Sequence, residues 1–282
     1  MTYIDFPNKK QKHPHYEHRS EKLDLKNSLF TSRRFHCVRK VSTKKKMLDS
    51  FGRISMHLNK KETSYVSTKD LDKVCFILIN DYDDLRKKDL GVGPLNDGYL
   101  VAIKHFRRGY KVFYLYDPLP EDFSNFLAFF LNYTQKELTV YYTGRSINGG
   151  IQFLFGFLSR EEIGDIISIN SNRKAKVVFL TDCPQDGSVF DINVIADKNS
   201  PSKYLMSFYV EKLFDPESKE SKRTHGICTY YFCKIIEHSP DITPQKLVDQ
   251  MSSSIKRFKE IFRCDISEHE LLNKPIFAGK FS

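Results

Sequence analysis

Apolar and polar positions along residues 70–282 form two alternating patterns. Short runs rich in β-branched and aromatic residues predict strands, whereas apolar positions spaced three or four apart predict helices. The predicted strands lie at about 73–79, 111–116, 137–142, 175–181 and 204–209. The predicted helices lie at about 95–107, 120–133, 159–167, 226–237 and 244–260, the first capped by Asn96 or Asp97.

The alternation of strands and helices predicts an α/β fold, with a mostly parallel central sheet covered by helices on both faces. Residues 61–282 are assigned to this domain, and the apolar run 153–158 is expected in its core. Residues 1–60 are assigned to a basic, extended N-terminal arm, because the first 45 residues show no sustained period of 3.6 or 2.

Positive charge is concentrated in the arm. Residues 1–50 hold 13 lysines and arginines against 5 aspartates and glutamates, a net of +8 out of +10 for the whole chain. Isolated aromatic residues and leucines punctuate this charge, a pattern that suits docking on an acidic surface with shallow apolar pockets. The basic residues expected to carry the binding are Lys9, Lys10, Lys12, Arg33, Arg34, Arg39, Lys40, Lys44, Lys45 and Lys46.

Composition excludes several classes of protein. The first thirty residues are polar and charged, which argues against a secretory signal, and no apolar run approaches the ~20 residues of a membrane span. The six cysteines show no Cys-x-x-Cys spacing, so we expect reduced thiols, no metal site, no cofactor and a cytoplasmic location. The acidic run 81–84 is interpreted as solvated loop carboxylates, with cation binding as the alternative.

Two loops carry the candidate chemistry. Thr143-Gly144-Arg145-Ser146 follows one predicted strand, and Asp182-Cys183-Pro184-Gln185-Asp186-Gly187-Ser188 follows another. Because parallel strands place their carboxyl ends at one edge of a sheet, both loops are expected at the edge where α/β proteins carry their functional groups.

The two loops resemble the His loop and the Cys loop of metacaspases, the caspase-like proteases of plants, fungi and protists. That family has Tyr-Ser-Gly-His-Gly in the first loop and Asp-x-Cys-His-Ser-Gly in the second. The segments 74–80, 93–97 and 225–231 agree with the family in order and spacing, so the resemblance covers about residues 70–282. It implies a caspase-like three-layer sandwich of peptidase family C14, clan CD.

The resemblance also implies that the catalytic dyad is degenerate. Arg145 stands at the His position, and a guanidinium stays protonated at any working pH, so it cannot act as the general base. The Cys position falls on Pro184 when the loop is aligned on its downstream Gly187-Ser188, which needs no gap, or on Cys183 when it is aligned on the upstream strand. We therefore expect no catalytic residues. The resemblance places Asp182 and Asp191 near the cleft, and Asp186 of the same loop is assigned to the cleft with them.

These observations lead to a hypothesis of a metacaspase-like pseudoprotease that binds through its arm to an acidic protein surface, with tubulin or another cytoskeletal polymer as a specific form. One alternative is a residual cysteine endopeptidase that uses Cys183. Another is a nucleic-acid-associated protein, ranked below a protein partner because no nucleic-acid motif accompanies the arm. No membrane partner is expected.

Overall fold

A computed structural model describes residues 44–58, 66, 68–82, 90, 92–171, 174–183, 189–197, 204–212, 226–255 and 260–277. Most of the predicted arm therefore lies outside the described residues.

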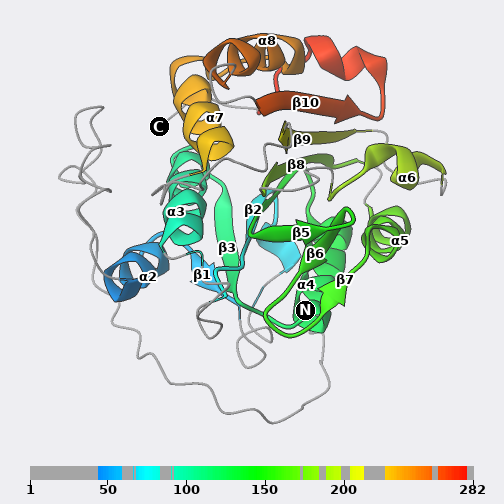
Figure 1. The fold of residues 1–282 in the computed structure, drawn as a ribbon. Helices are drawn as coiled ribbons and strands as arrows, with labels where there is room; N and C mark the ends of the chain where they lie inside the picture. The colour runs from blue at the N-terminus through cyan, green and yellow to red at the C-terminus, as the bar shows by residue number, and fades with distance from the viewer. Residues whose placement is uncertain are drawn as a thin grey trace.

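A seven-stranded sheet forms the centre of the molecule, in the order β1-β3-β2-β4-β8-β9-β10 (Figure 1). Every neighbouring pair is parallel except β9 and β10, which are antiparallel. The strands are β1 (Met56–His57), β2 (Lys73–Ile79), β3 (Lys111–Tyr116), β4 (Glu137–Thr143), β8 (Lys176–Asp182), β9 (Leu205–Lys212) and β10 (Glu260–Ile266).

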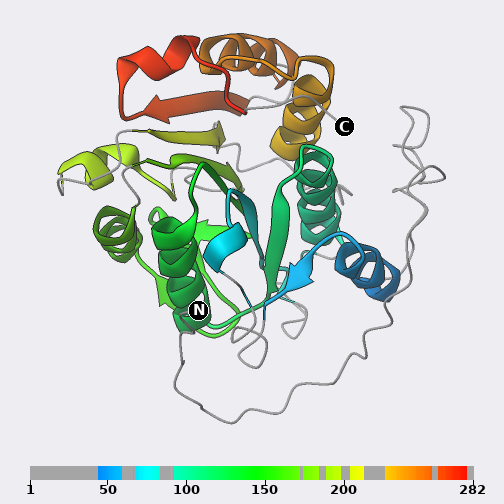
Figure 2. The same ribbon diagram turned by 180° about the vertical axis from the view of Figure 1, so that it is seen from behind.

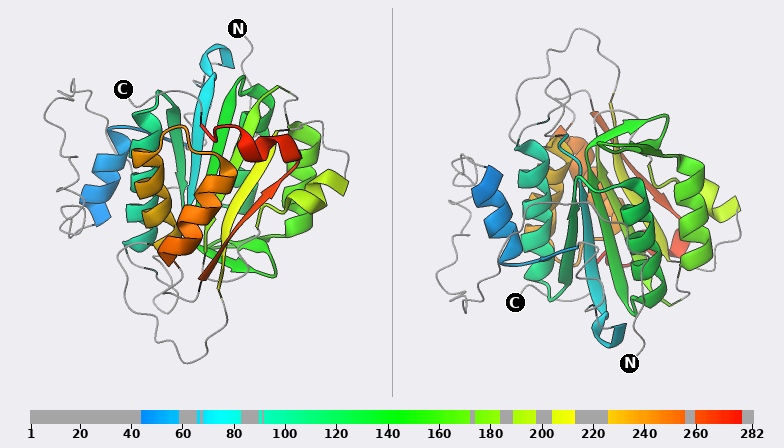
Figure 3. Two further views of the ribbon diagram at one scale, coloured as in Figure 1. Left: turned by 90° about the horizontal axis from the view of Figure 1, so that it is seen from above. Right: turned by 90° about the horizontal axis from the view of Figure 1, so that it is seen from below.

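Helices cover both faces of the sheet, as the views from behind and from above and below show (Figures 2 and 3). One face packs against α2 (Lys44–Gly52), α3 (Gly93–Phe106), α7 (Ile227–His238) and α8 (Pro244–Ile255). The other face packs against α4 (Pro120–Tyr133), α5 (Arg160–Asn170) and α6 (Ile192–Asp197). Short 3-10 turns occur at η4 (Thr68–Asp70) and η6 (His269–Asn273). The predicted α/β class, a mostly parallel sheet between two helical layers, is confirmed.

Alternation along the strands builds the two cores. In β2, Cys75, Ile77 and Ile79 belong to one core, while the intervening residues Val74, Phe76 and Leu78 belong to the other. Burial on both faces explains why this strand is an almost continuous apolar run in the sequence.

A second, three-stranded antiparallel sheet lies apart from the central one (Figure 1). Its strands are β5 (Arg145–Ile147), β6 (Gly150–Gln152) and β7 (Phe157–Leu158). The expectation that 153–158 forms core is correct for Phe153 but wrong for Phe155 and Phe157, which are exposed. A run this short cannot distinguish buried from exposed positions by its hydropathy alone.

The segment 44–58, which the sequence places in the arm, packs on the sheet. Met47 and Phe51 of α2 are buried, and β1 pairs with β3 at the edge of the sheet. Three lysines begin α2 and dominate its composition, so its apolar face could not be recognised from the sequence. In the part of the chain that the structure describes, the packed domain therefore includes α2 and its first residue, Lys44.

Two further elements differ from the prediction. The predicted helix 244–260 ends at Ile255, and β10 follows at Glu260. Helix α3 begins at Gly93 with Pro94 in its first turn, and its N-cap position, Val92, makes no side-chain capping bond. The assignment of Asn96 or Asp97 as the cap is therefore wrong, and both residues lie inside the helix and are buried. None of the helices in the described ranges has the length and apolar character needed to span a bilayer.

Candidate functional site

The pairing of β4 with β8 brings the two candidate loops together at the carboxyl edge of the sheet. Thr143 and Asp182, the last residues of these strands, are direct register partners. The next residue of β8's chain, Cys183, is buried, and its Sγ donates a hydrogen bond to Ser146 Oγ at 3.3 Å. The Arg145 loop and the first residue of the Cys loop are thus neighbours.

The Arg145 loop is held against the end of β2 by Tyr82. Arg145 donates its backbone N–H to the Tyr82 hydroxyl at 2.9 Å, and its guanidinium carbon lies 5.8 Å from the centre of the Tyr82 ring. The hydroxyl in turn donates to the Gln152 carbonyl at 2.7 Å. Glycine is required at position 144, next to Arg145, because a Cβ there would lie 2.7 Å from the Tyr142 hydroxyl.

Tyr82 is a residue that the sequence analysis did not single out. It is fully buried and has a φ of +61°, which is unusual for a residue with a large side chain. Burial is the main cause that raises its pKa, so the phenol stays protonated and can donate to Gln152. The sequence contained one signal, a tyrosine directly after a buried strand, but nothing in it indicated the left-handed conformation.

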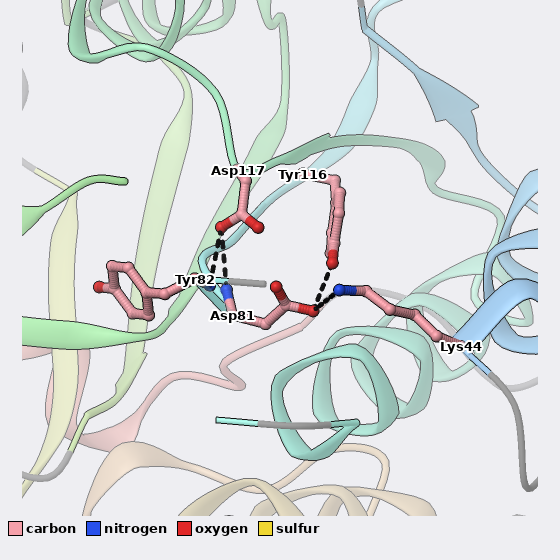
Figure 4. Close-up of polar contacts among 5 residues, drawn as sticks. All are labelled: Lys44, Asp81, Tyr82, Tyr116 and Asp117. Carbon is pink, nitrogen blue, oxygen red and sulfur yellow. Dashed lines mark hydrogen bonds and ion pairs between the residues drawn. The ribbon is translucent and has the colours of Figure 1, made fainter. Parts of the chain in front are cut away.

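Carboxylates hold this conformation in place (Figure 4). Asp117 Oδ1 accepts the backbone N–H groups of Asp81 and Tyr82 at 3.0 and 3.2 Å. Asp81 Oδ2 pairs with Lys44 Nζ at 2.8 Å and accepts the Tyr116 hydroxyl. The interpretation of Asp81 as a solvated loop carboxylate is therefore wrong, because its side chain is completely buried and paired.

The environment of Asp117 changes the pKa of its carboxyl group. Burial, followed by a hydrogen bond with Asp81 and repulsion from it, raises the pKa of Asp117 to about 7. The carboxyl group of Asp117 therefore titrates near neutral pH, unlike an ordinary aspartate.

Asp182 is engaged on the side of the sheet that faces α7. Its Oδ2 accepts both the backbone N–H of Thr229, at 2.8 Å, and the Thr229 hydroxyl, at 2.6 Å. These bonds satisfy an amide in the first turn of α7, whose N-cap residue Gly226 has no side chain to do so. Gly226 itself donates to Asp97 Oδ2 at 2.7 Å. The carboxylate placed near the cleft by resemblance is thus a fixed structural contact of α7.

Asp191 is engaged in a similar way at α6. Its Oδ2 pairs with Arg160 at 3.3 Å, and its Oδ1 accepts the backbone N–H of Asn193 at 2.9 Å. Pro184 and Asp186 lie outside the described residues, so the choice between Pro184 and Cys183 for the Cys position stays open. The cleft role of the three aspartates stays a prediction.

His105 is a histidine buried in the core of the fold. It lies near the end of α3, away from Cys183, with Nδ1 2.9 Å from the Val101 carbonyl and with the rings of Tyr110 and Phe277 packed edge-on against it. Burial lowers its pKa to about 4, so the ring is neutral at physiological pH. In the part of the chain that the structure describes, no group of three or more His, Cys, Asp or Glu side chains could hold a metal ion.

The contact between Gly226 and Asp182 gives a first test. A Cβ at Gly226 would lie 2.0 Å from Asp182 Oδ2, so Gly226→Ala should force the carboxylate off Thr229 and lower the free energy of unfolding by roughly 1–3 kcal/mol. Urea denaturation measures this change. Gly52→Ala is the matched control, since its Cβ meets nothing within 4 Å. Equal stability of the two variants would contradict the assigned contact.

The raised pKa of Asp117 gives a second test. Protonation favours the folded state, so this contribution to stability is complete below about pH 4 and is lost as the pH rises through about 7. Asp117→Asn keeps an oxygen acceptor for Asp81 and Tyr82 but carries no charge. Relative to the wild type, the free energy of unfolding of Asp117→Asn should therefore rise by roughly 1–2 kcal/mol as the pH increases from 5 to 8.

Unfolding by denaturant at a series of pH values measures the difference. Asp49→Asn, at an exposed position of α2, is the control and should track the wild type. If the difference in free energy of unfolding between Asp117→Asn and the wild type stayed constant across the pH range, the raised pKa of Asp117 would be contradicted.

Solved structures share this architecture. The crystal structure of caspase-1 from Spodoptera frugiperda superposes with a TM-score of 0.53 and 9% sequence identity, covering 72% of this chain and 88% of that chain. The Drosophila initiator caspase Dronc matches with a TM-score of 0.47 and 12% identity, covering 70% of this chain and 80% of that chain. No protein-family model and no curated protein matches the sequence. The chain has a caspase-like fold, a mostly parallel central sheet between two layers of helices.

Proposed function

We propose that this chain is a metacaspase-like pseudoprotease, a caspase-fold module that binds rather than cleaves. The observation that carries the proposal is Arg145, which follows β4 at the position where the metacaspase motif has its histidine and lies next to Ser146, the hydrogen-bond partner of Cys183. The site therefore has a cation where a cysteine protease needs a proton acceptor.

The chemistry of peptide cleavage supports this proposal. A thiolate must attack the carbonyl, and a base must then return a proton to the leaving amine. A nearby cation can favour a thiolate, but a guanidinium cannot accept and return the proton. Cys183 is also only 4% exposed, so a peptide has little access to its sulfur.

The arm supplies the binding. Its lysines and arginines suit an acidic protein surface, and its aromatic residues suit shallow apolar pockets on that surface. An acidic cytoskeletal polymer such as a microtubule, in the cytoplasm, is the specific form of the proposal. A nucleic acid would also attract the arm, with an affinity that depends steeply on salt but not on sequence.

The absence of turnover is the first testable consequence. Full-length protein should leave peptides with Lys or Arg at the cleavage position intact, and Cys183→Ala should behave identically because no base assists the thiol. Product release from fluorogenic peptides measures this. Turnover by the wild type that disappears in Cys183→Ala would establish the alternative, a residual cysteine endopeptidase.

The second testable consequence concerns the positive charge of the arm. Deleting residues 1–50 would remove Met47 from the core, so substitution in the full chain is the cleaner change. Replacing seven of the ten basic residues that precede α2 by glutamine should lower co-sedimentation with microtubules by at least about tenfold, since several ion pairs are lost together. The substituted residues are Lys9, Lys10, Lys12, Arg33, Arg34, Arg39 and Lys40.

The control for this experiment changes exposed lysines of the domain. Lys111, Lys136 and Lys274 are more than half exposed, and their replacement by glutamine should leave co-sedimentation unchanged. Equal loss in both variants would contradict docking through the arm. Binding of the wild type to duplex DNA in place of microtubules, at the same salt, would favour the nucleic-acid alternative.

A further inference from the structure

One face of the small β5–β6–β7 sheet carries large apolar side chains that are exposed, beside the partly buried Arg145 and Gln152. Along its strands, the side chains of Ser146, Ile151 and Leu158 point inward and are buried. The opposite face carries Ile147 and Phe157, each 43% exposed, and the preceding turn carries Phe155, which is 64% exposed. We call these three residues the small-sheet patch.

Two of these side chains lie together, and the third follows in the same short hairpin. Gly150 pairs with Ile147 across β5 and β6, and a Cβ at Gly150 would lie 2.4 Å from the Phe157 ring. The Phe157 ring therefore covers Gly150 beside Ile147. Six large apolar side chains are exposed in the described ranges, and three of them belong to this patch. Such clustering is typical of an interaction surface, whereas single exposed apolar residues are ordinary.

Carboxylates border the patch. Gly156 lies against Pro120, because a Cβ there would be 2.9 Å from the proline ring, so Phe155 sits beside the first turn of α4 with Glu121 and Asp122. Phe157 is two residues before Ser159, the N-cap of α5, whose first turn carries two more acids, Glu161 and Glu162. Acidic residues also suit helix N-termini, and two cations lie nearby, Arg145 on the same face of the sheet and Arg160 against Gly149. The four carboxylates outnumber these cations, so the border of the patch favours a basic occupant.

The first described residue of the chain is linked to the small sheet through the end of β2. Lys44, the first residue of α2, pairs with Asp81. Tyr82, which follows Asp81, donates its hydroxyl to the carbonyl of Gln152 in β6. Consecutive residues at the end of β2 thus tie the start of the folded chain to the small sheet. The 43 residues before Lys44 reach up to ~140 Å when fully extended, so the small-sheet patch is within their reach.

The chemistry of those residues matches the patch. Residues 1–43 hold ten lysines and arginines against four aspartates and glutamates, together with isolated apolar side chains such as Tyr3, Phe6 and Phe30. We propose that the small-sheet patch is a docking surface for the chain's own residues 1–43. This goes beyond the proposed function, because it gives the arm a second site, within its own molecule, that competes with an external acidic partner.

Photo-crosslinking in the full chain tests the proposal. p-Benzoylphenylalanine placed at Phe155 should crosslink on irradiation to peptides from residues 1–43, in material that runs as a monomer. The same amino acid placed at Ile169, which is 76% exposed near the end of α5, is the matched control. Mass spectrometry of the digested monomer identifies the partner peptides.

Charge reversal makes the test specific. Glu121→Lys with Glu161→Lys should lower the yield of this crosslink about tenfold, since each lost surface ion pair is worth roughly a factor of three to five. Asp249→Lys with Glu270→Lys, at exposed sites on α8 and η6, should leave the yield unchanged. Raising the salt to about 1 M, where the Debye length falls to about 3 Å, should act like the first pair.

Three outcomes would overturn the proposal: no crosslink from position 155, crosslinks to other segments only, or crosslinks found only in a dimer, which would assign the patch to a second copy. The result does not depend on the proposed function, because no partner is present. If microtubules fail to bind while the crosslink forms, only the proposed partner is wrong. If microtubules bind but no crosslink forms, only the docking inference is wrong.

Discussion

The structure depends on the parallel, in-register pairing of β2, β4 and β8. Ile79 pairs with Thr143, and Thr143 pairs with Asp182, so three strands end at one level of the sheet. The residues that follow these ends are therefore neighbours, although they lie up to a hundred positions apart in the sequence. Without this register, Tyr82 could not support the Arg145 loop, and Cys183 could not meet Ser146.

At the strand ends, polar groups are used for structure. The hydroxyl of Tyr82 joins two segments of chain, Asp117 fixes the turn that contains it, and Asp182 satisfies the first turn of α7. These groups are bonded to the protein itself, and together they fix the segments that meet at this edge of the sheet.

The sequence was most informative where apolar periodicity is strong. β3 and α4 follow their predicted bounds, because buried runs and helical spacing determine both. The sequence was least informative for short elements such as β5, β6 and β7, whose two or three residues contain no period. β10 was missed, because the predicted helix ran to about residue 260 and residues 261–266 were assigned to no element.

In the site, the juxtaposition of the Arg145 and Cys183 loops followed from strand order, which a sequence can indicate. The burial of Asp81 could not be predicted, because it depends on Lys44 and Tyr116, which come from separate elements. The left-handed conformation of Tyr82 likewise depends on Asp117, 35 residues later. Contacts between distant segments leave no local pattern in the sequence.

The ion pair between Lys44 and Asp81 also determines how the molecule bears mechanical load. A pull applied at Lys44, the first described residue, passes through this pair directly to the end of a central strand. Behind it, the buried rings of Phe51 and Tyr114 pack with their centres 4.3 Å apart and anchor α2 on the sheet. Tension is thus delivered to the interior of the sheet, and β1, a two-residue edge strand that would peel easily, is shielded from it.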